Sequence, residues 1–202
     1  MHSETRSIGS CSEKLIIYLA VNGGNLDAKG AGFWNCRKFG QNCPVEAGVK
    51  FSIDSSESIT FNWVNNIQIG LTSINSLPTH LVINSCNNVI VRNVKLIAPD
   101  ESPNADGIHI QSSTSVIITG SILQTGDDCI SIGPGTRNLL MDNIKCGPGH
   151  ALVVLRGSFK EDGVENIKVT NTVFTGSDNG VRIKSWARPS TGFVRNAVFK
   201  TL

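Results

Sequence analysis

The segment Asp106-Gly-Ile-His-Ile110 returns 22 residues later as Asp128-Cys-Ile-Ser-Ile132, and after another 22 residues as His150-Ala-Leu-Val-Val154. Apolar residues alternate with small or polar residues in the first two copies, which is the period of a β-strand with one buried face. A repeat of this length is typical of a solenoid, whose coils bury their apolar faces only by stacking on one another. The spacing predicts two internal ladders, one of Ile108, Ile130 and Leu152 and one of Ile110, Ile132 and Val154.

A second repeated pattern interleaves with the first one. It starts with Asn or Ser and continues with alternating apolar residues, and its copies begin at Asn66, Asn88, Ser115, Asn138 and Asn166. Leu81-Val-Ile83 and Val181-Arg-Ile183 extend the first series, so each coil should contain at least two strands. No segment keeps a helical period of 3.6 residues. We therefore predict an all-β fold, a single-stranded right-handed parallel β-helix, with residues 1–202 forming one domain.

Size and charge narrow the range of functions. A chain of 202 residues suits one domain with a sizeable core. Its 18 Lys and Arg nearly balance 16 Asp and Glu, which argues against a nucleic-acid or membrane partner bound by bulk charge. The apolar run at residues 15–21 is too short to span a bilayer and lacks the flanks of a signal peptide, so we expect a strand there.

The six cysteines indicate an oxidising compartment. None of their spacings is C-x-x-C, and no pair of histidines completes a zinc pattern, so we expect no metal site.

Polar residues follow the same register as the apolar ladders. Asp106, Asp128 and His150 are separated by 22 residues each, and Asp127 stands beside them. In a structural interpretation, Asp residues at solenoid corners only cap turns. In the functional interpretation, converging carboxyl groups push one another's pKa values apart and so divide acid and base roles.

Two cations follow on the next coil. Alternation predicts Arg182 and Lys184 on the outer face, with Val181 and Ile183 pointing inward. They would suit an extended anionic ligand, or alternatively form salt bridges with the aspartates or a solvated strip. Paired acids without a metal pattern, a nucleophilic Ser or Cys arrangement or a phosphate loop indicate glycoside hydrolysis, for which no cofactor is expected.

Four motifs resemble those of polygalacturonases of glycoside hydrolase family 28, most closely the plant members, and the similarity covers approximately residues 20–200. The motifs are Ser102-Pro-Asn-Ala-Asp-Gly-Ile-His109, Thr125-Gly-Asp-Asp-Cys-Ile-Ser-Ile132, Cys146-Gly-Pro-Gly-His150 and Val181-Arg-Ile-Lys-Ser-Trp186.

The resemblance implies inverting hydrolysis of α-1,4-linked galacturonate in pectin by a secreted enzyme of the cell wall, and we expect a monomer. Asp127 would be the general acid, Asp106 and Asp128 would hold and deprotonate the attacking water, and His150 would set the protonation of the acid. Substrate binding would fall to Asn104, His109, Arg182 and Lys184. The family also implies a disulfide between Cys129 and Cys146, and Cys36 with Cys43 as a second pair.

The chain departs from the family pattern in two respects. After His150 it carries Ala151, with Val153 and Leu155 expected to project into the cleft. Family members also continue for several coils beyond the Arg-Ile-Lys strand, so we expect this chain to correspond to part of a family member. The alternatives are a catalytically impaired pectin-binding protein, a structural β-helix, or a neighbouring specificity such as rhamnogalacturonan. Endo or exo action is left open.

Overall fold

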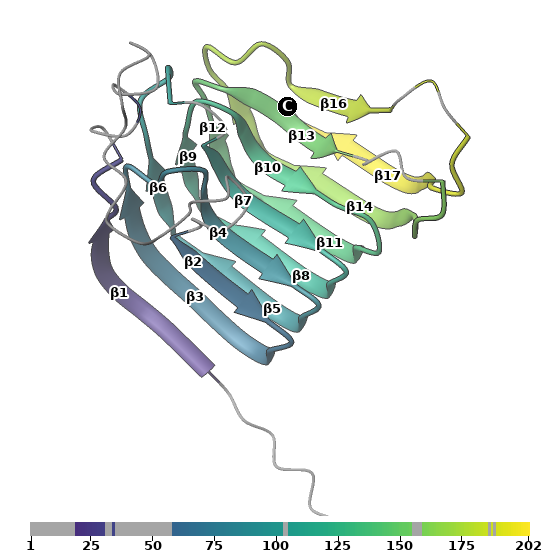
Figure 1. Cartoon of the computed structure of the whole chain (residues 1–202), viewed down its shortest axis with the longest axis horizontal. Helices are drawn as coiled ribbons and strands as arrows, with labels where there is room; N and C mark the ends of the chain where they lie inside the picture. Colours follow the sequence, from purple (N-terminus) through teal and green to yellow (C-terminus); the bar gives the residue numbers. More distant parts are fainter. Residues whose placement is uncertain are drawn as a thin grey trace, which may run out of the picture.

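The structure, a computed structural model, describes residues 19–30, 34, 58–102, 105–154, 159–185, 187 and 189–202. The strands of successive coils lie side by side and stack along one axis (Figure 1). Every strand pairing between them is parallel, which confirms the predicted parallel β-helix.

One face of the solenoid is a six-stranded sheet, called here the site sheet. In spatial order it contains β16 (Val181–Lys184), β13 (His150–Val154), β10 (Asp128–Ile132), β7 (Asp106–Gln111), β4 (Thr79–Asn84) and β2 (Ile59–Asn62).

The other two faces are limbs of one larger sheet. The long strand β3 (Asn65–Ile74) pairs with both limbs, and β1 (Leu19–Asp27) pairs with β3. The first limb contains β5 (Asn87–Arg92), β8 (Thr114–Thr119), β11 (Arg137–Asp142), β14 (Val164–Thr170) and β17 (Val194–Lys200). The second limb contains β6 (Lys95–Ile97), β9 (Ile122–Gln124), β12 (Lys145–Cys146) and β15 (Val173–Phe174).

The register of the site sheet confirms the predicted apolar ladder at its centre. Ile108 pairs with Ile130, which pairs with Leu152 on its other side. Ile110 pairs with Ile132 one step further along the same strands. All four isoleucines are fully buried. The side chains of residues 151–154 lie outside the described part of the structure, so the ladder is seen up to Ile130 and Ile132.

The second repeated pattern lies near the start of each strand of the first limb. The backbone conformation at these positions explains why most of them are Asn. The residues that we call the asparagine row have φ between 54° and 60°, and they are Asn66, Asn88, Ser115, Asn138, Asn166 and Asn196. This left-handed region is costly for most side chains and is tolerated best by Gly, Asn and Asp. The amide of Asn88 donates to Asn66 at 2.7 Å, and that of Asn166 donates to Asn138 at 2.9 Å.

The structure differs from the sequence expectation at the last strand of the site sheet. The pairing between β13 and β16 shifts register between Leu152 and Val154, so that Val154 pairs with Lys184 rather than with Ile183. Ile183 is 53% exposed in this edge strand, and its inward direction stays a prediction. The extra residue in β16 breaks the strict alternation on which that prediction rested.

The start of β1 and one disulfide agree with the predictions from the sequence, as far as the described residues reach. Of the strand expected at residues 15–21, Leu19 to Val21 open β1, and residues 15–18 lie outside the described part. Cys129 and Cys146 form the expected disulfide, whereas Cys36 and Cys43 are outside the described residues. No helix in the described residues is long and apolar enough to cross a membrane.

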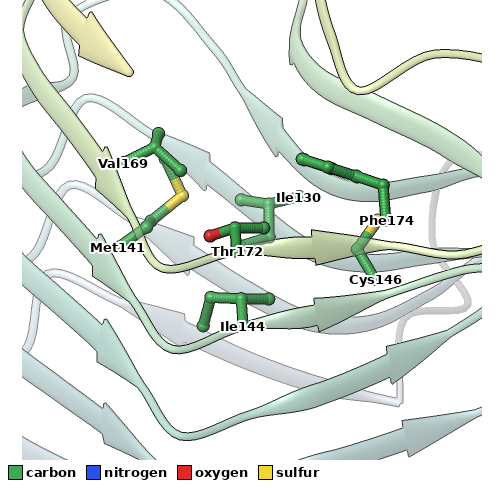
Figure 2. A pocket seen from close by; sticks show the side chains of 7 residues that line it. All are labelled: Ile130, Met141, Ile144, Cys146, Val169, Thr172 and Phe174. Atoms are coloured by element: carbon green, nitrogen blue, oxygen red, sulfur yellow. The ribbon is translucent and has the colours of Figure 1, made fainter. Parts of the chain in front are cut away.

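The interior of the solenoid is closely packed. An apolar recess lies between the coils, lined by seven side chains that Figure 2 labels, among them Ile130, Val169 and Phe174. It holds no space large enough for a water molecule. This recess therefore has no room for a ligand.

Candidate active site

The predicted polar row lies where strands of the site sheet begin. Asp128 is the first residue of β10 and pairs with His150, the first residue of β13. Asp106 begins β7, two residues before Ile108, which pairs with Ile130. These three residues are called here the acid row. Asp127 precedes the row in the turn that enters β10.

Two glycines allow the turns beside Asp127 and His150 to close tightly. A Cβ atom at Gly126 would lie 2.5 Å from the carbonyl oxygen of Asp100, and one at Gly149 would lie 2.5 Å from that of Asp127. Gly149 also has a φ of +125°, which L side chains rarely adopt. The backbone N–H of His150 donates to the Asp127 carbonyl at 2.9 Å. The backbone thus fixes His150 beside Asp127.

Asp106 is a buried carboxyl group with a strongly raised pKa. Burial raises its pKa to about 7, and the charges of Asp127 and Asp128 add to this effect. The hydroxyl of Ser131 donates to Oδ2 of Asp106 at 2.7 Å and offsets part of the shift. Asp106 is therefore largely protonated in mildly acidic solution.

A hydrogen-bonded chain continues from Asp106 across the outer face of the sheet. Nδ1 of His109 lies 2.7 Å from the Ser131 hydroxyl oxygen, and Nε2 lies 3.4 Å from Oε1 of Gln111. Because Ser131 uses its only hydroxyl proton on Asp106, Nδ1 of His109 must be the donor to Ser131. Substrate binding by His109 stays a prediction, and in this structure the ring orients Ser131.

Asp128 is paired with Lys184 across the intervening strand. The ammonium lies 2.8 Å from Oδ2 of Asp128, whose side chain is 5% exposed. Burial raises the pKa of Asp128, and the hydrogen bond from Lys184 opposes that rise. The salt bridge that sequence analysis kept as an alternative for Lys184 is thus present.

His150 lies between two carboxylates. Its Nδ1 is 3.0 Å from Oδ1 of Asp127, and its Nε2 is 3.2 Å from Oδ2 of Asp178. The hydrogen bond with Asp127 is the largest cause of a raised pKa at His150, and the charges of Asp127, Asp128 and Asp178 contribute further. Both contacts favour the imidazolium form.

The site also has the donor types of a metal centre. One atom each from Asp127, Asp128 and His150 lies within 4.8 Å of the others, and an ion could be held there. Lys184 already supplies a positive charge to Asp128, and both nitrogens of His150 face carboxylates. These ion pairs favour acid–base chemistry over metal binding at this site. The absence of a metal stays a prediction.

The structure brings together most of the predicted site residues. Asp106, Asp127, Asp128, His150 and Lys184 form one cluster. Arg182 is exposed and forms no ion pair with any described residue, and Asn104, like Leu155, lies outside the described part. The expectation that Val153 projects into the cleft concerns a side chain that is likewise not described.

Two residues of the site, Ser131 and Asp178, are not among the site residues predicted from the sequence. Ser131 belongs to the outward row of β10 and could have been found from its register with His109. Asp178 lies in a turn outside every ladder, so no periodic signal points to it.

The comparisons with known proteins identify the family of the chain. Residues 4–202 match the family described as glycosyl hydrolases family 28. A polygalacturonase from Prunus persica is 41% identical and covers 98% of this chain and 50% of its own length. One from Nicotiana tabacum is 36% identical and covers 94% of this chain and 46% of its own length.

A solved structure extends the likeness to three dimensions. The endo-xylogalacturonan hydrolase from Aspergillus tubingensis superimposes with a TM-score of 0.70 at 26% identity, covering 87% of this chain and 47% of its own. The present chain thus spans about half the length of the relatives it matches.

Proposed function

The chain belongs to glycosyl hydrolase family 28, and we propose that it hydrolyses α-1,4-galacturonosidic bonds of polygalacturonate by acid and base catalysis. The observation that carries the proposal is the acid row with Asp127, where three carboxyl groups, a histidine with a raised pKa and an ammonium meet at the entrance of adjacent strands. Groups in such a cluster take different protonation states, as hydrolysis of a glycosidic bond requires.

In this proposal Asp127 is the general acid. It gives a proton to the oxygen of the leaving sugar, and His150 supports it by holding an N–H at 3.0 Å from the carboxylate. Family resemblance supplies this role, and the contact with His150 supports it. The proton on His150 Nδ1 is placed to compensate the charge of Asp127 when the acid ionises.

Asp106 and Asp128 then share the attacking water in unequal roles. Asp106, with a pKa of about 7, still carries a proton in mildly acidic solution and can donate a hydrogen bond to the water. Asp128 has the ammonium of Lys184 at 2.8 Å, which favours its ionised form and so keeps it available to accept a proton. The water loses its proton to Asp128 as it attacks the anomeric carbon.

Inversion at the anomeric carbon is the stereochemical part of the proposal and rests on the resemblance. An oxygen of Asp127 and one of Asp128 lie within 4.8 Å. The carboxyl groups of most inverting glycosidases are roughly 6.5–9.5 Å apart, so the spacing supplies no independent support.

The substrate would be a polyanion bound along the outer face of the site sheet. Arg182 has no ion pair among the described residues and can form a bidentate contact with a uronate carboxylate. The disulfide between Cys129 and Cys146 supports a secreted protein, because such bonds persist in oxidising compartments. Action in the cell wall as a monomer belongs to the same proposal.

The test measures reducing ends released from polygalacturonate by the native chain, Asp127→Asn and Asp162→Asn. Asp162 is an exposed carboxylate beside the turn at Gly135, at the far ends of the site-sheet strands, and serves as the matched control. We expect activity in the native chain and the control, and a loss of about 10²–10⁴-fold in Asp127→Asn. Fully methyl-esterified pectin should be a poor substrate.

Two results would contradict the proposal. Binding of trigalacturonate without cleavage by the native chain would favour the catalytically impaired pectin-binding protein. Neither binding nor cleavage would favour a structural β-helix.

A further inference from the structure

Asp178 is held against His150 by backbone contacts as well as by its side chain. Ser177 forms a parallel bridge with Gly149, the residue before His150. The backbone N–H of Asp178 donates to the carbonyl oxygen of Gly149 at 3.1 Å. The turn that precedes β16 is thus attached to the start of β13, and the Asp178 side chain emerges beside the histidine.

The two contacts of His150 specify the state of its ring. Nδ1 faces a carboxylate oxygen of Asp127 at 3.0 Å, and Nε2 faces one of Asp178 at 3.2 Å. Ionised carboxylates only accept hydrogen bonds, and a neutral imidazole has only one N–H to give. When both carboxylates are ionised, both contacts are favourable at the same time only if both ring nitrogens carry protons.

We infer that Asp178 is a positioning residue of this site, whose carboxylate forms an ion pair with Nε2 of His150 and so holds the imidazolium ring with Nδ1 against Asp127. The contact itself is independent of the reaction, and only its kinetic consequence rests on the proposed function. With Asp178 in place, a carboxylate lies beside each ring nitrogen. Without it, the Nε2 side is open to solvent and the ring can turn away from Asp127.

Several charged groups face His150. Asp127 comes from the turn before β10, Asp128 from β10 itself and Asp178 from the turn before β16, and all three favour the cation. Lys184, from β16, is paired with Asp128 and partly cancels its charge. The Asp178 side chain is 74% exposed, so its charge is screened by salt, and its share of the shift should depend on ionic strength.

The test is an NMR titration of the His150 imidazole in the native chain, in Asp178→Asn and in the control Asp162→Asn. Asn retains the size and the acceptor oxygen of Asp but not its charge. The chain has four histidines, and the signal of His150 is identified by its loss in His150→Gln. In low salt we expect the pKa of His150 to be lower in Asp178→Asn than in the native chain.

Salt and the control sharpen this result. The difference between the native chain and Asp178→Asn should shrink at 0.5 M salt, and Asp162→Asn should titrate like the native chain. Equal pKa values of His150 in the native chain and in Asp178→Asn at low salt would overturn the inference.

Kinetics give a second and separate readout. In Asp178→Asn the alkaline limb of the kcat/KM profile on polygalacturonate should move to lower pH by the same shift, while Asp178→Glu should restore it. An inactive native chain would contradict the proposed function, and the NMR titration would still decide the role of Asp178. An unmoved alkaline limb in an active Asp178→Asn variant would contradict the positioning role.

Discussion

Two vertical rows of polar side chains in this solenoid differ in nearly every property other than their stacking. The asparagine row consists almost entirely of one residue type, is mostly exposed, and its members donate to one another at 2.7–3.0 Å. The acid row contains two carboxyl groups and an imidazole, and its members have raised pKa values. One row satisfies a backbone requirement, and the other accumulates unlike charges.

Two aspartates, Asp142 on the first limb and Asp106 on the site sheet, show the same difference. Asp142, at a corner of the first limb, accepts hydrogen bonds from Thr170 at 2.7 Å and from Asn171 at 2.8 Å, and these lower its pKa. Asp106 is buried, and burial raises its pKa to about 7. A stacked Asp is therefore structural where hydrogen bonds to its ionised form dominate, and is a candidate for chemistry where burial dominates.

Asp106→Asn should have the largest effect on stability. Between about pH 4 and pH 7 the unfolded chain releases the Asp106 proton and the folded chain retains it, so native stability falls as pH rises. A shift from 3.8 to about 7 corresponds to at most about 4 kcal/mol above pH 7. Denaturant unfolding should show Asp106→Asn more stable than the native chain at pH 8 and nearly equal to it at pH 4.

If the stability difference between the native chain and Asp106→Asn does not change from pH 4 to pH 8, the proposed difference between the acid row and the asparagine row is wrong. Asp106 would then behave like a member of the asparagine row. Asp142→Asn is the matched control, because its carboxyl group has a shift of the opposite sign.

Asn138→Ala should have the next largest effect, without pH dependence. Asn138 has a φ of +55° and accepts a hydrogen bond from Asn166 at 2.9 Å. Placing Ala in this conformation and losing the bond should cost about 1–2 kcal/mol in urea unfolding, equally at pH 5 and pH 8.

Asn138→Gly separates the two causes of that loss. It removes the hydrogen bond, but Gly adopts a positive φ without strain. The loss of stability should therefore be smaller than in Asn138→Ala. Equal losses in the two variants would show that the left-handed backbone is not the reason for Asn at this position.

Ser131→Ala should have the smallest effect and should connect the acid row to its neighbours. The Ser131 hydroxyl donates to Asp106 at 2.7 Å and lowers its pKa. Its loss should raise the pKa of Asp106 further and destabilise the folded chain by about 1 kcal/mol at pH 8, with a smaller effect at pH 5. A lower pKa of Asp106 in Ser131→Ala would contradict the assigned direction of this hydrogen bond.

The fold could be predicted from the sequence where strands are long enough to show alternation. The strands that begin near Asn66 and Ile108 contain several apolar residues at a period of two. The spacing between successive copies of these strands predicted the length of one coil. The second limb could not be predicted, because strands as short as Lys145–Cys146 and Val173–Phe174 contain no period. The register shift opposite β16 could not be predicted either, because it leaves no mark on the residue types.

The site could be predicted as far as it follows the coil repeat. The 22-residue spacing placed Asp128 beside His150, and the structure confirms this pairing. Asp178 could not be predicted, since a turn attached to Gly149 brings it there. The pKa of Asp106 likewise depends on burial by the surrounding coils rather than on its neighbours in sequence.

The difference between the two rows is tested most directly by carbon-13 NMR titration of the carboxyl groups of Asp106 and Asp142 in the native chain. The account predicts that Asp106 titrates near pH 7 and Asp142 below its ordinary pKa of 3.8. Titration of both carboxyl groups together near pH 4 would contradict it.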